Sequence, residues 1–145
     1  MIVDANLLVY ARDAASPFHD RIRPWLEDAL NGPARVGLPW QSLIAFHRVT
    51  TRSNAPNPLS PEEASEQVRE WLDAPAAWVP VETPDHAEVL AALVATHNVD
   101  GRLIHDAHLA ALAICHGVEV FSADGDFARF PEVRWANPLA AGDPA

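Results

Sequence analysis

The sequence predicts an α/β fold in which helices flank a short central parallel sheet. Short apolar runs typical of buried strands alternate with longer segments whose apolar residues recur at helical spacing. Strands that alternate with helices favour a parallel sheet covered on both faces. The chain has 145 residues, of which 49% are hydrophobic. We therefore expect one domain, residues 1–145, with a core that folds without a disulfide or a structural metal.

Five short segments are predicted as strands. They are residues 2–3, 36–38, 78–81, 118–121 and 134–136. The first run ends at Asp4, and the fourth leads directly into Ser122, Asp124 and Asp126. Binding sites of open α/β sheets lie at the carboxyl ends of the strands. These polar residues therefore follow the strands at the place where a site is expected.

Five longer segments are predicted as helices from the spacing of their apolar residues. They are residues 18–30, 40–52, 60–73, a segment that begins at 83–84 and carries apolar residues to 94, and residues 103–115. Ser60, followed by Pro61 and Glu63, has the pattern of a capping box with proline in the first turn. Gly117 is the predicted stop of the last helix.

The charge balance restricts the chemistry. The net charge is −10, from 20 acids against 10 bases, and every base is an arginine. Without lysine, the chain has no lysine nucleophile, Schiff base or phosphate-loop lysine. An acidic protein binds nucleic acid weakly, because attraction to phosphate supplies most of the non-specific affinity. A nucleic-acid substrate therefore requires that bound divalent metal or a basic partner offset the negative field.

The remaining composition points to the cytoplasm. Cys115 is the only cysteine, so no internal disulfide forms and a reducing compartment is expected. The first ten residues are apolar but contain Asp4 and Asn6, which is not the pattern of a signal peptide. No run approaches the roughly 20 apolar residues of a membrane-spanning helix.

Acidic and polar side chains form the candidate site. They are Asp4, Asn6, Asp106, Ser122, Asp124 and Asp126. Such oxygen donors suit Mg²⁺ or Mn²⁺, and a metal held this way supports hydrolysis of a phosphodiester. Taken singly, Asp4 is equally consistent with a helix cap, and residues 124–126 with a simple turn. Asp106 is harder to explain structurally, because aspartate in the middle of a helix is unfavourable.

Four stretches, taken together, resemble the PIN-domain ribonuclease toxins of the VapC family. They are residues 2–11, 39–51, 105–112 and 121–130, in the family's order and covering nearly the whole chain. The resemblance implies a three-layer PIN-like fold and Mg²⁺ or Mn²⁺ held mainly by Asp4, Asp106 and Asp124, with Asp126 alongside. Asn6 and Ser122 would orient the carboxylates or the attacking water.

The same resemblance implies an endoribonuclease, the toxin of a type II toxin–antitoxin pair. Cleavage of an RNA such as tRNA or rRNA would leave a 5′-phosphate. A homodimer and a cognate VapB-like antitoxin are the partners that the resemblance implies.

One departure from the family pattern concerns the second motif. The glutamate usual before Phe46 is replaced by Ala45, and no acid occurs between Asp28 and Glu62. Gln41 lies one turn earlier on the same helix face and offers a carbonyl oxygen. The departure puts a second metal in doubt. It also leaves open a non-catalytic PIN module that binds a partner or RNA without turnover.

Histidines and arginines complete the candidate residues. His105 and His108, near Cys115, are metal-ligand types, but their spacing fits no closed zinc site, so we expect both histidines to line the cleft or contact phosphate. The candidate phosphate-binding arginines are Arg48, Arg52 and Arg102. Solvated surface arginines are an equally good interpretation of each.

Two other functional classes remain at this stage. A phosphate-accepting receiver domain also clusters aspartates at strand ends, but it relies on a lysine that this chain lacks. A magnesium-dependent phosphatase is compatible with the same carboxylate chemistry.

Overall fold

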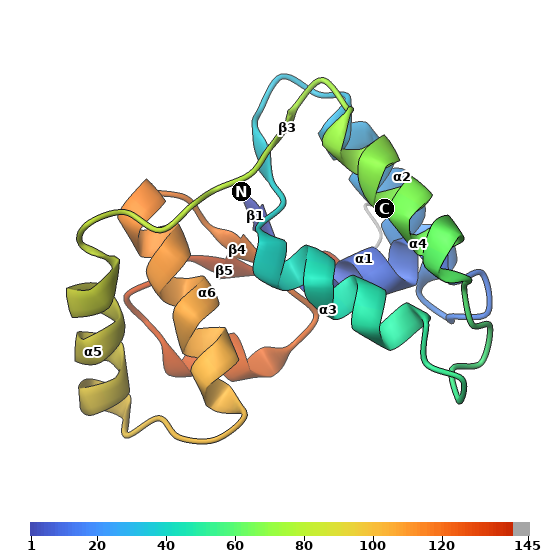
Figure 1. Ribbon diagram of the computed structural model, residues 1–145. Coiled ribbons are helices and arrows are strands. Elements are labelled where there is room, and N and C mark those ends of the chain that lie inside the picture. The colour runs from blue at the N-terminus through green and yellow to red at the C-terminus, as the bar shows by residue number, and fades with distance from the viewer. Residues whose placement is uncertain (141–145) are drawn as a thin grey trace.

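The computed structural model describes residues 1–140 and contains one five-stranded sheet (Figure 1). The strands are β1 (Ile2–Val3), β2 (Val36–Gly37), β3 (Ala77–Trp78), β4 (Val120–Phe121) and β5 (Trp135–Ala136). Their order in the sheet is β3-β2-β1-β4-β5, and every neighbouring pair is parallel. The predicted parallel sheet is therefore confirmed, with β1 at its centre.

Within residues 1–140, six α-helices and one 3₁₀ helix surround the sheet. They are α1 (Ala5–Arg12), α2 (His19–Leu30), α3 (Trp40–Thr50), α4 (Pro61–Leu72), α5 (His86–His97), α6 (Leu103–His116) and η1 (Gly125–Arg129). The five predicted helices are all present. Helix α1 is an addition that the residue pattern did not predict, because its eight residues are too few for a clear helical period.

Two apolar clusters lie on opposite faces of the sheet. Val3 packs into the cluster that contains the inward faces of α1–α4, whereas Ile2 belongs to the cluster built on α5, α6 and η1. Successive residues of a strand point to opposite faces, so this short strand reaches both cores. Figure 1 shows α5 and α6 on one side of the sheet and α1–α4 on the other, the three-layer arrangement that was predicted.

The start of α4 and the end of α6 lie where the sequence predicts them. The Ser60 side chain accepts a hydrogen bond from the Glu63 backbone, and the Glu63 side chain accepts one from the Ser60 backbone, which completes the capping box before α4. Gly117 ends α6 in the left-handed conformation, with φ of 67°. This stop turns the chain from α6 into β4 and toward the acidic residues that follow it.

None of the helices within residues 1–140 has both the length and the apolar composition needed to cross a membrane.

The left-handed backbone at Gly117 predicts a stability difference between two glycines. Gly117→Ala should lower the free energy of unfolding by about 1–2 kcal/mol, because a Cβ is disfavoured in this conformation. Gly125 has no positive φ and open space around it, so Gly125→Ala should be close to neutral. Urea denaturation of both variants measures the difference, and equal destabilisation would contradict it.

Candidate active site

The site begins where the two central strands end. Asp4 directly follows β1 and Ser122 directly follows β4, and these two strands are neighbours in the sheet. The Asp4 backbone N–H donates to the Phe121 carbonyl at 2.9 Å, which continues the strand pairing up to the acid. The Asp4 side chain also caps α1 by accepting a hydrogen bond from the Ala5 N–H at 2.8 Å. The helix-cap role considered for Asp4 is therefore present, together with its place in the site.

Ser122 is the centre of a hydrogen-bond network among the predicted residues. Its hydroxyl donates to Asp4 Oδ2 at 2.7 Å and accepts from Asn6 Nδ2 at 3.1 Å and from the Asp124 N–H at 3.0 Å. The Asn6 side-chain oxygen accepts from the Ala123 N–H at 3.2 Å. Ser122 is fully buried, so its hydroxyl is both satisfied and fixed. The network holds Asp4 and Asn6 against the loop that follows β4.

Three aspartates converge beyond this network. Asp106, Asp124 and Asp126 each offer a carboxylate oxygen, and these oxygens lie within 4.8 Å of one another. Asp124 caps η1 by accepting from the Asp126 N–H at 2.9 Å, which orients both side chains of the 124–126 turn. Asp106 comes from α6, on the other side of the site. Here this group is called the aspartate cluster.

The structure corrects one argument made from the sequence. Asp106 does not lie in the middle of its helix but in the first turn of α6, which begins at Leu103. Negative side chains are favoured there, because the amide groups at a helix N-terminus are partly positive. The position is therefore suitable for an acid, and the reason to assign it a ligand role is its distance to Asp124 and Asp126 rather than any cost to the helix.

Repulsion and burial disturb the ionisation of the site. Loss of solvent, followed by the negative charges of Asp124, Asp4 and Asp126, raises the pKa of Asp106 from 3.8 to about 7, although Arg102 acts in the opposite direction. Burial also raises the pKa of Asp4, against the hydrogen bonds from Ser122 and Ala5 that lower it. The groups around these two carboxylates therefore do not fully stabilise their ionised forms.

These residues fit a divalent metal with a preference for oxygen ligands. All three donors of the aspartate cluster are carboxylates, the ligand type that Mg²⁺ and Mn²⁺ favour. A cation among them would also relieve the repulsion that raises the pKa of Asp106. Within residues 1–140, no group that includes Cys115 or a histidine meets the same 4.8 Å criterion, so the zinc interpretation has no support.

The aspartate cluster differs from the ligand set that the family resemblance implies, and which aspartates bind the metal stays a prediction. Asp126, expected only alongside the metal, belongs to the 4.8 Å group, whereas Asp4 lies outside it. Asp4 is nevertheless close enough for its charge to raise the pKa of Asp106. One oxygen of Asp4 is engaged by Ala5 and the other by Ser122.

Helix α3 approaches the site through an uncharged residue. Gln41 Nε2 donates to the carbonyl oxygen of His105 at 2.9 Å, which links the first turns of α3 and α6. The Gln41 Oε1 atom is buried and has no hydrogen-bond partner among the residues described. Ala45, where the second-motif glutamate would stand, supplies no ligand. The contribution of α3 is therefore an amide group and not a carboxylate.

The two histidines expected in the cleft are in different surroundings. His105 is exposed beside Asp106. His108 points elsewhere, because residues two apart on a helix lie about 200° apart around its axis. Its Nδ1 is 2.9 Å from Nε2 of His86, and its Nε2 is 3.4 Å from Glu82. No sequence signal marked His86 or Glu82 as partners of His108.

The three candidate arginines are all exposed, but at different distances from the site. Arg102 immediately precedes α6, and its charge acts on Asp106. Arg48 is two turns along α3 from Gln41. Arg52 lies beyond the far end of α3, which at 1.5 Å per residue puts about 15 Å between it and Gln41. Of the three candidates, Arg102 is therefore the arginine whose charge acts on the aspartate cluster.

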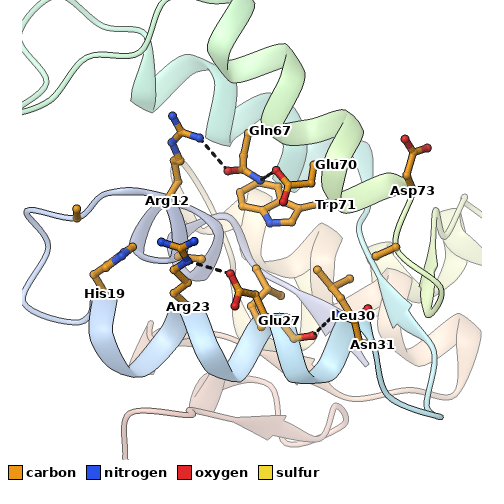
Figure 2. Close-up of a pocket in the computed structure, with 14 residues that line it drawn as sticks. Arg12, His19, Arg23, Glu27, Leu30, Asn31, Gln67, Glu70, Trp71 and Asp73 are labelled. Carbon is orange, nitrogen blue, oxygen red and sulfur yellow. Dashed lines mark hydrogen bonds and ion pairs between the residues drawn. The ribbon is translucent and has the colours of Figure 1, made fainter.

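A cavity of about 660 Å³ lies between α1, α2 and α4, away from the aspartate cluster (Figure 2). Two of its arginines pair with neighbouring side chains. Arg23 contacts Glu27 at 2.9 Å, and Arg12 donates to Gln67 at 3.1 Å. Because none of the predicted site residues lines it, this cavity is separate from the candidate active site.

The raised pKa of Asp106 predicts how pH affects the metal-free protein. An acid whose pKa is higher in the folded state stabilises that state below its unfolded pKa and loses this contribution as pH rises through the folded value. The melting temperature of the wild type should therefore fall relative to that of Asp106→Asn between about pH 4 and 7. Thermal denaturation in EDTA across pH 4–8 measures this. A constant difference between the two proteins would contradict the assignment.

Comparison with known proteins agrees with this geometry. Residues 1–133 match the family model of the PIN domain. The chain is 44% identical over 140 residues to ribonuclease VapC37 of Mycobacterium tuberculosis, covering 96% of this chain and 97% of that protein. It is 36% identical over 140 residues to ribonuclease VapC33 of the same species, covering 96% of this chain and 98% of that protein.

Solved structures show the same fold at lower identity. VapBC2 of Rickettsia felis, bound to a DNA fragment from its promoter, gives a TM-score of 0.71 at 15% identity, covering 94% of this chain and 96% of that chain. VapC20 of M. tuberculosis, described as a sarcin–ricin loop cleaving toxin, gives a TM-score of 0.66 at 20% identity. The match covers 92% of this chain and 98% of that chain. With a family model over most of its length and close relatives that are VapC ribonucleases, the chain belongs to the PIN-domain family and, within it, to the VapC ribonucleases.

Proposed function

We propose that this protein is a metal-dependent endoribonuclease, the toxin component of a type II toxin–antitoxin pair. It hydrolyses RNA phosphodiester bonds and leaves a 5′-phosphate. The observation that carries the proposal is the convergence of Asp106, Asp124 and Asp126 within 4.8 Å at the carboxyl end of the sheet. The relatives named as ribonucleases support the reaction class.

The aspartate cluster would hold Mg²⁺ or Mn²⁺, with Asp4 contributing negative charge from the neighbouring strand. Such a metal, when bound, lowers the pKa of a water and offsets the charge that develops on the phosphoryl group. Ser122 and Asn6 position Asp4 through their hydrogen bonds. Asp124 fixes the turn that carries Asp126. Each of these residues acts by holding a carboxylate in place.

An RNA substrate has to approach an acidic protein. The charge of Arg102 acts on Asp106, and Arg48 is exposed on α3. Both are therefore proposed to contact phosphate. Arg52 and the exposed His105 would act further from the scissile bond. The similar VapC20, a sarcin–ricin loop cleaving toxin, supports a structured RNA, such as rRNA or tRNA, as the target class.

The proposed partners follow from the related assemblies. Several similar structures are toxin–antitoxin complexes, which supports a VapB-like antitoxin as the regulator of this chain. Trp40 and Ile44 are 51% and 60% exposed on one face of α3, an apolar surface consistent with a homodimer. We also propose that residues 1–145 form a single domain and that the protein acts in the cytoplasm.

The alternative of a non-catalytic PIN module is not favoured. It rests on the absence of a carboxylate at Ala45. The aspartate cluster is formed entirely by other residues. The relatives covering nearly the whole chain at 44% and 36% identity are named ribonucleases. Loss of one acid from α3 therefore leaves the proposed metal-binding group intact.

A cleavage assay tests the proposal. Purified, antitoxin-free protein is incubated with total bacterial RNA in Mg²⁺, Mn²⁺ or EDTA. We expect discrete fragments with 5′-phosphate ends in either metal and none in EDTA. Asp4→Asn and Asp124→Asn should each reduce the rate about 100-fold or more, because even outer-shell changes at metal sites cost about 10–100-fold.

The matched control is Asp28→Asn, which removes an exposed acid from α2 and should leave the rate unchanged. Cleavage that persists in EDTA, or that is equal in all variants, would reject the metal-dependent mechanism. A small phosphomonoester as second substrate distinguishes a phosphatase.

A further inference from the structure

The Gln41 side chain connects α3 to the part of α6 that carries Asp106. Gln41 is the second residue of α3, and its Nε2 donates to the carbonyl oxygen of His105 at 2.9 Å. His105 directly precedes Asp106 in the first turn of α6. A shift of this backbone would move the Asp106 carboxylate relative to Asp124 and Asp126.

The first turn of α6 has little other side-chain hydrogen bonding, although the Leu103 and Ile104 N–H groups donate to the Asp100 and Gly101 carbonyls at 3.2 Å. Its N-cap residue, Arg102, makes no side-chain capping hydrogen bond. The preceding turn contains exposed residues at 100–102, with Gly101 at φ of 57°. For residues 103–107, the bond from Gln41 is the only side-chain hydrogen bond to another element in the described part of the chain. The orientation of this turn therefore depends on these two backbone hydrogen bonds, on Gln41 and on apolar packing.

The carbonyl oxygen of His105 requires a hydrogen-bond donor. A carbonyl oxygen only accepts hydrogen bonds, so the group that faces His105 has to be the NH₂ of Gln41. The other atom of the amide, Oε1, then points away from that carbonyl. Oε1 is buried and without a partner among residues 1–140, and buried polar atoms in folded proteins are normally satisfied by protein groups or by water.

The neutrality of Gln41 suits its surroundings. A carboxylate at this position would lose the donor and face the negative end of the His105 carbonyl. It would also add a negative charge beside Asp106. Burial, followed by like-charge repulsion, already raises the pKa of Asp106. With Ala45 in place of an acid, α3 supplies a donor to the site without a further negative charge.

We propose that Gln41 is a positioning residue for the reaction, an inference that rests on the proposed ribonuclease function. Its Nε2 holds the first turn of α6 through the His105 carbonyl and so keeps Asp106 opposite Asp124 and Asp126. Its Oε1 accepts a hydrogen bond from a water at the edge of the site. Gln41 thus acts through another residue and is not itself a ligand.

Substitutions of Gln41 separate this role from that of a ligand. Gln41→Met keeps the length but removes the donor, and Gln41→Glu replaces the donor with a carboxylate. Both should lower kcat by about 10–100-fold with little change in KM, as expected for loss of a residue that orients a metal ligand. Both should also weaken Mn²⁺ binding, measured by calorimetry.

The matched control is Gln67→Met, which removes an equally half-buried glutamine that bonds Arg12 across two helices away from the site. This variant should keep wild-type kcat and Mn²⁺ affinity. Hydrogen exchange in the metal-free proteins gives a readout independent of activity. Amides of residues 103–109 should exchange faster in both Gln41 variants than in the wild type and in Gln67→Met.

Three results would overturn the inference. They are unchanged exchange at residues 103–109, unchanged Mn²⁺ affinity in Gln41→Met, and stronger Mn²⁺ binding with retained activity in Gln41→Glu. The last would make residue 41 a metal ligand. If the wild type cleaves no RNA, the proposed function fails. Mn²⁺ binding and hydrogen exchange still decide whether Gln41 positions Asp106.

Discussion

Mutual repulsion among four aspartates is the constraint on which the design of this site depends. Asp106, Asp124 and Asp126 converge within 4.8 Å, and the charge of Asp4 reaches them from the neighbouring strand. Loss of solvent around Asp106, followed by the like charges beside it, raises the pKa of Asp106 to about 7, so full ionisation of the group is disfavoured near neutral pH when no cation is present. The fold therefore has to hold these acids together against a force that separates them.

The residues that hold the acids are neutral hydrogen-bonding groups. The Ser122 hydroxyl contacts Asp4, Asn6 and the backbone of Asp124 at the same time. Trp135 adds a further tie, since its Nε1 donates to the Ser122 carbonyl at 3.1 Å. Neutral donors restrain the carboxylates without neutralising their charge. The charge remains available to a divalent cation, which the same arrangement would bind most strongly when all the acids are ionised.

The sequence predicts this architecture well where strands and helix signals are strong. Residues 2–3 and 118–121 are predicted strands followed by acids, so the parallel sheet and its carboxyl-end site follow from the alternation of strands with helices. The Ser60 capping box and the Gly117 stop are equally local signals. Each of these depends on a few neighbouring residues, and each is confirmed.

The features that the sequence does not indicate are set by the direction of side chains around a helix and by tertiary contacts. His108 follows Asp106 by two residues but faces Glu82 and His86, because the helix turns it away. Whether Asp4 or Asp126 completes the cluster depends on how the turn after β4 folds onto α6. The contact between Gln41 and His105 joins residues 64 apart in the sequence, and no local pattern marks it.

Metal binding coupled to proton release tests the central claim most directly. If the aspartates share one electrostatic environment, Mn²⁺ has to displace the proton of Asp106, whose pKa is raised to about 7. Calorimetric titrations at each pH in two buffers of different ionisation enthalpy should show about one proton released at pH 6 and almost none above pH 8. Asp106→Asn should release none at either pH. Mn²⁺ binding with no proton release at pH 6, or no binding at all, would contradict the account.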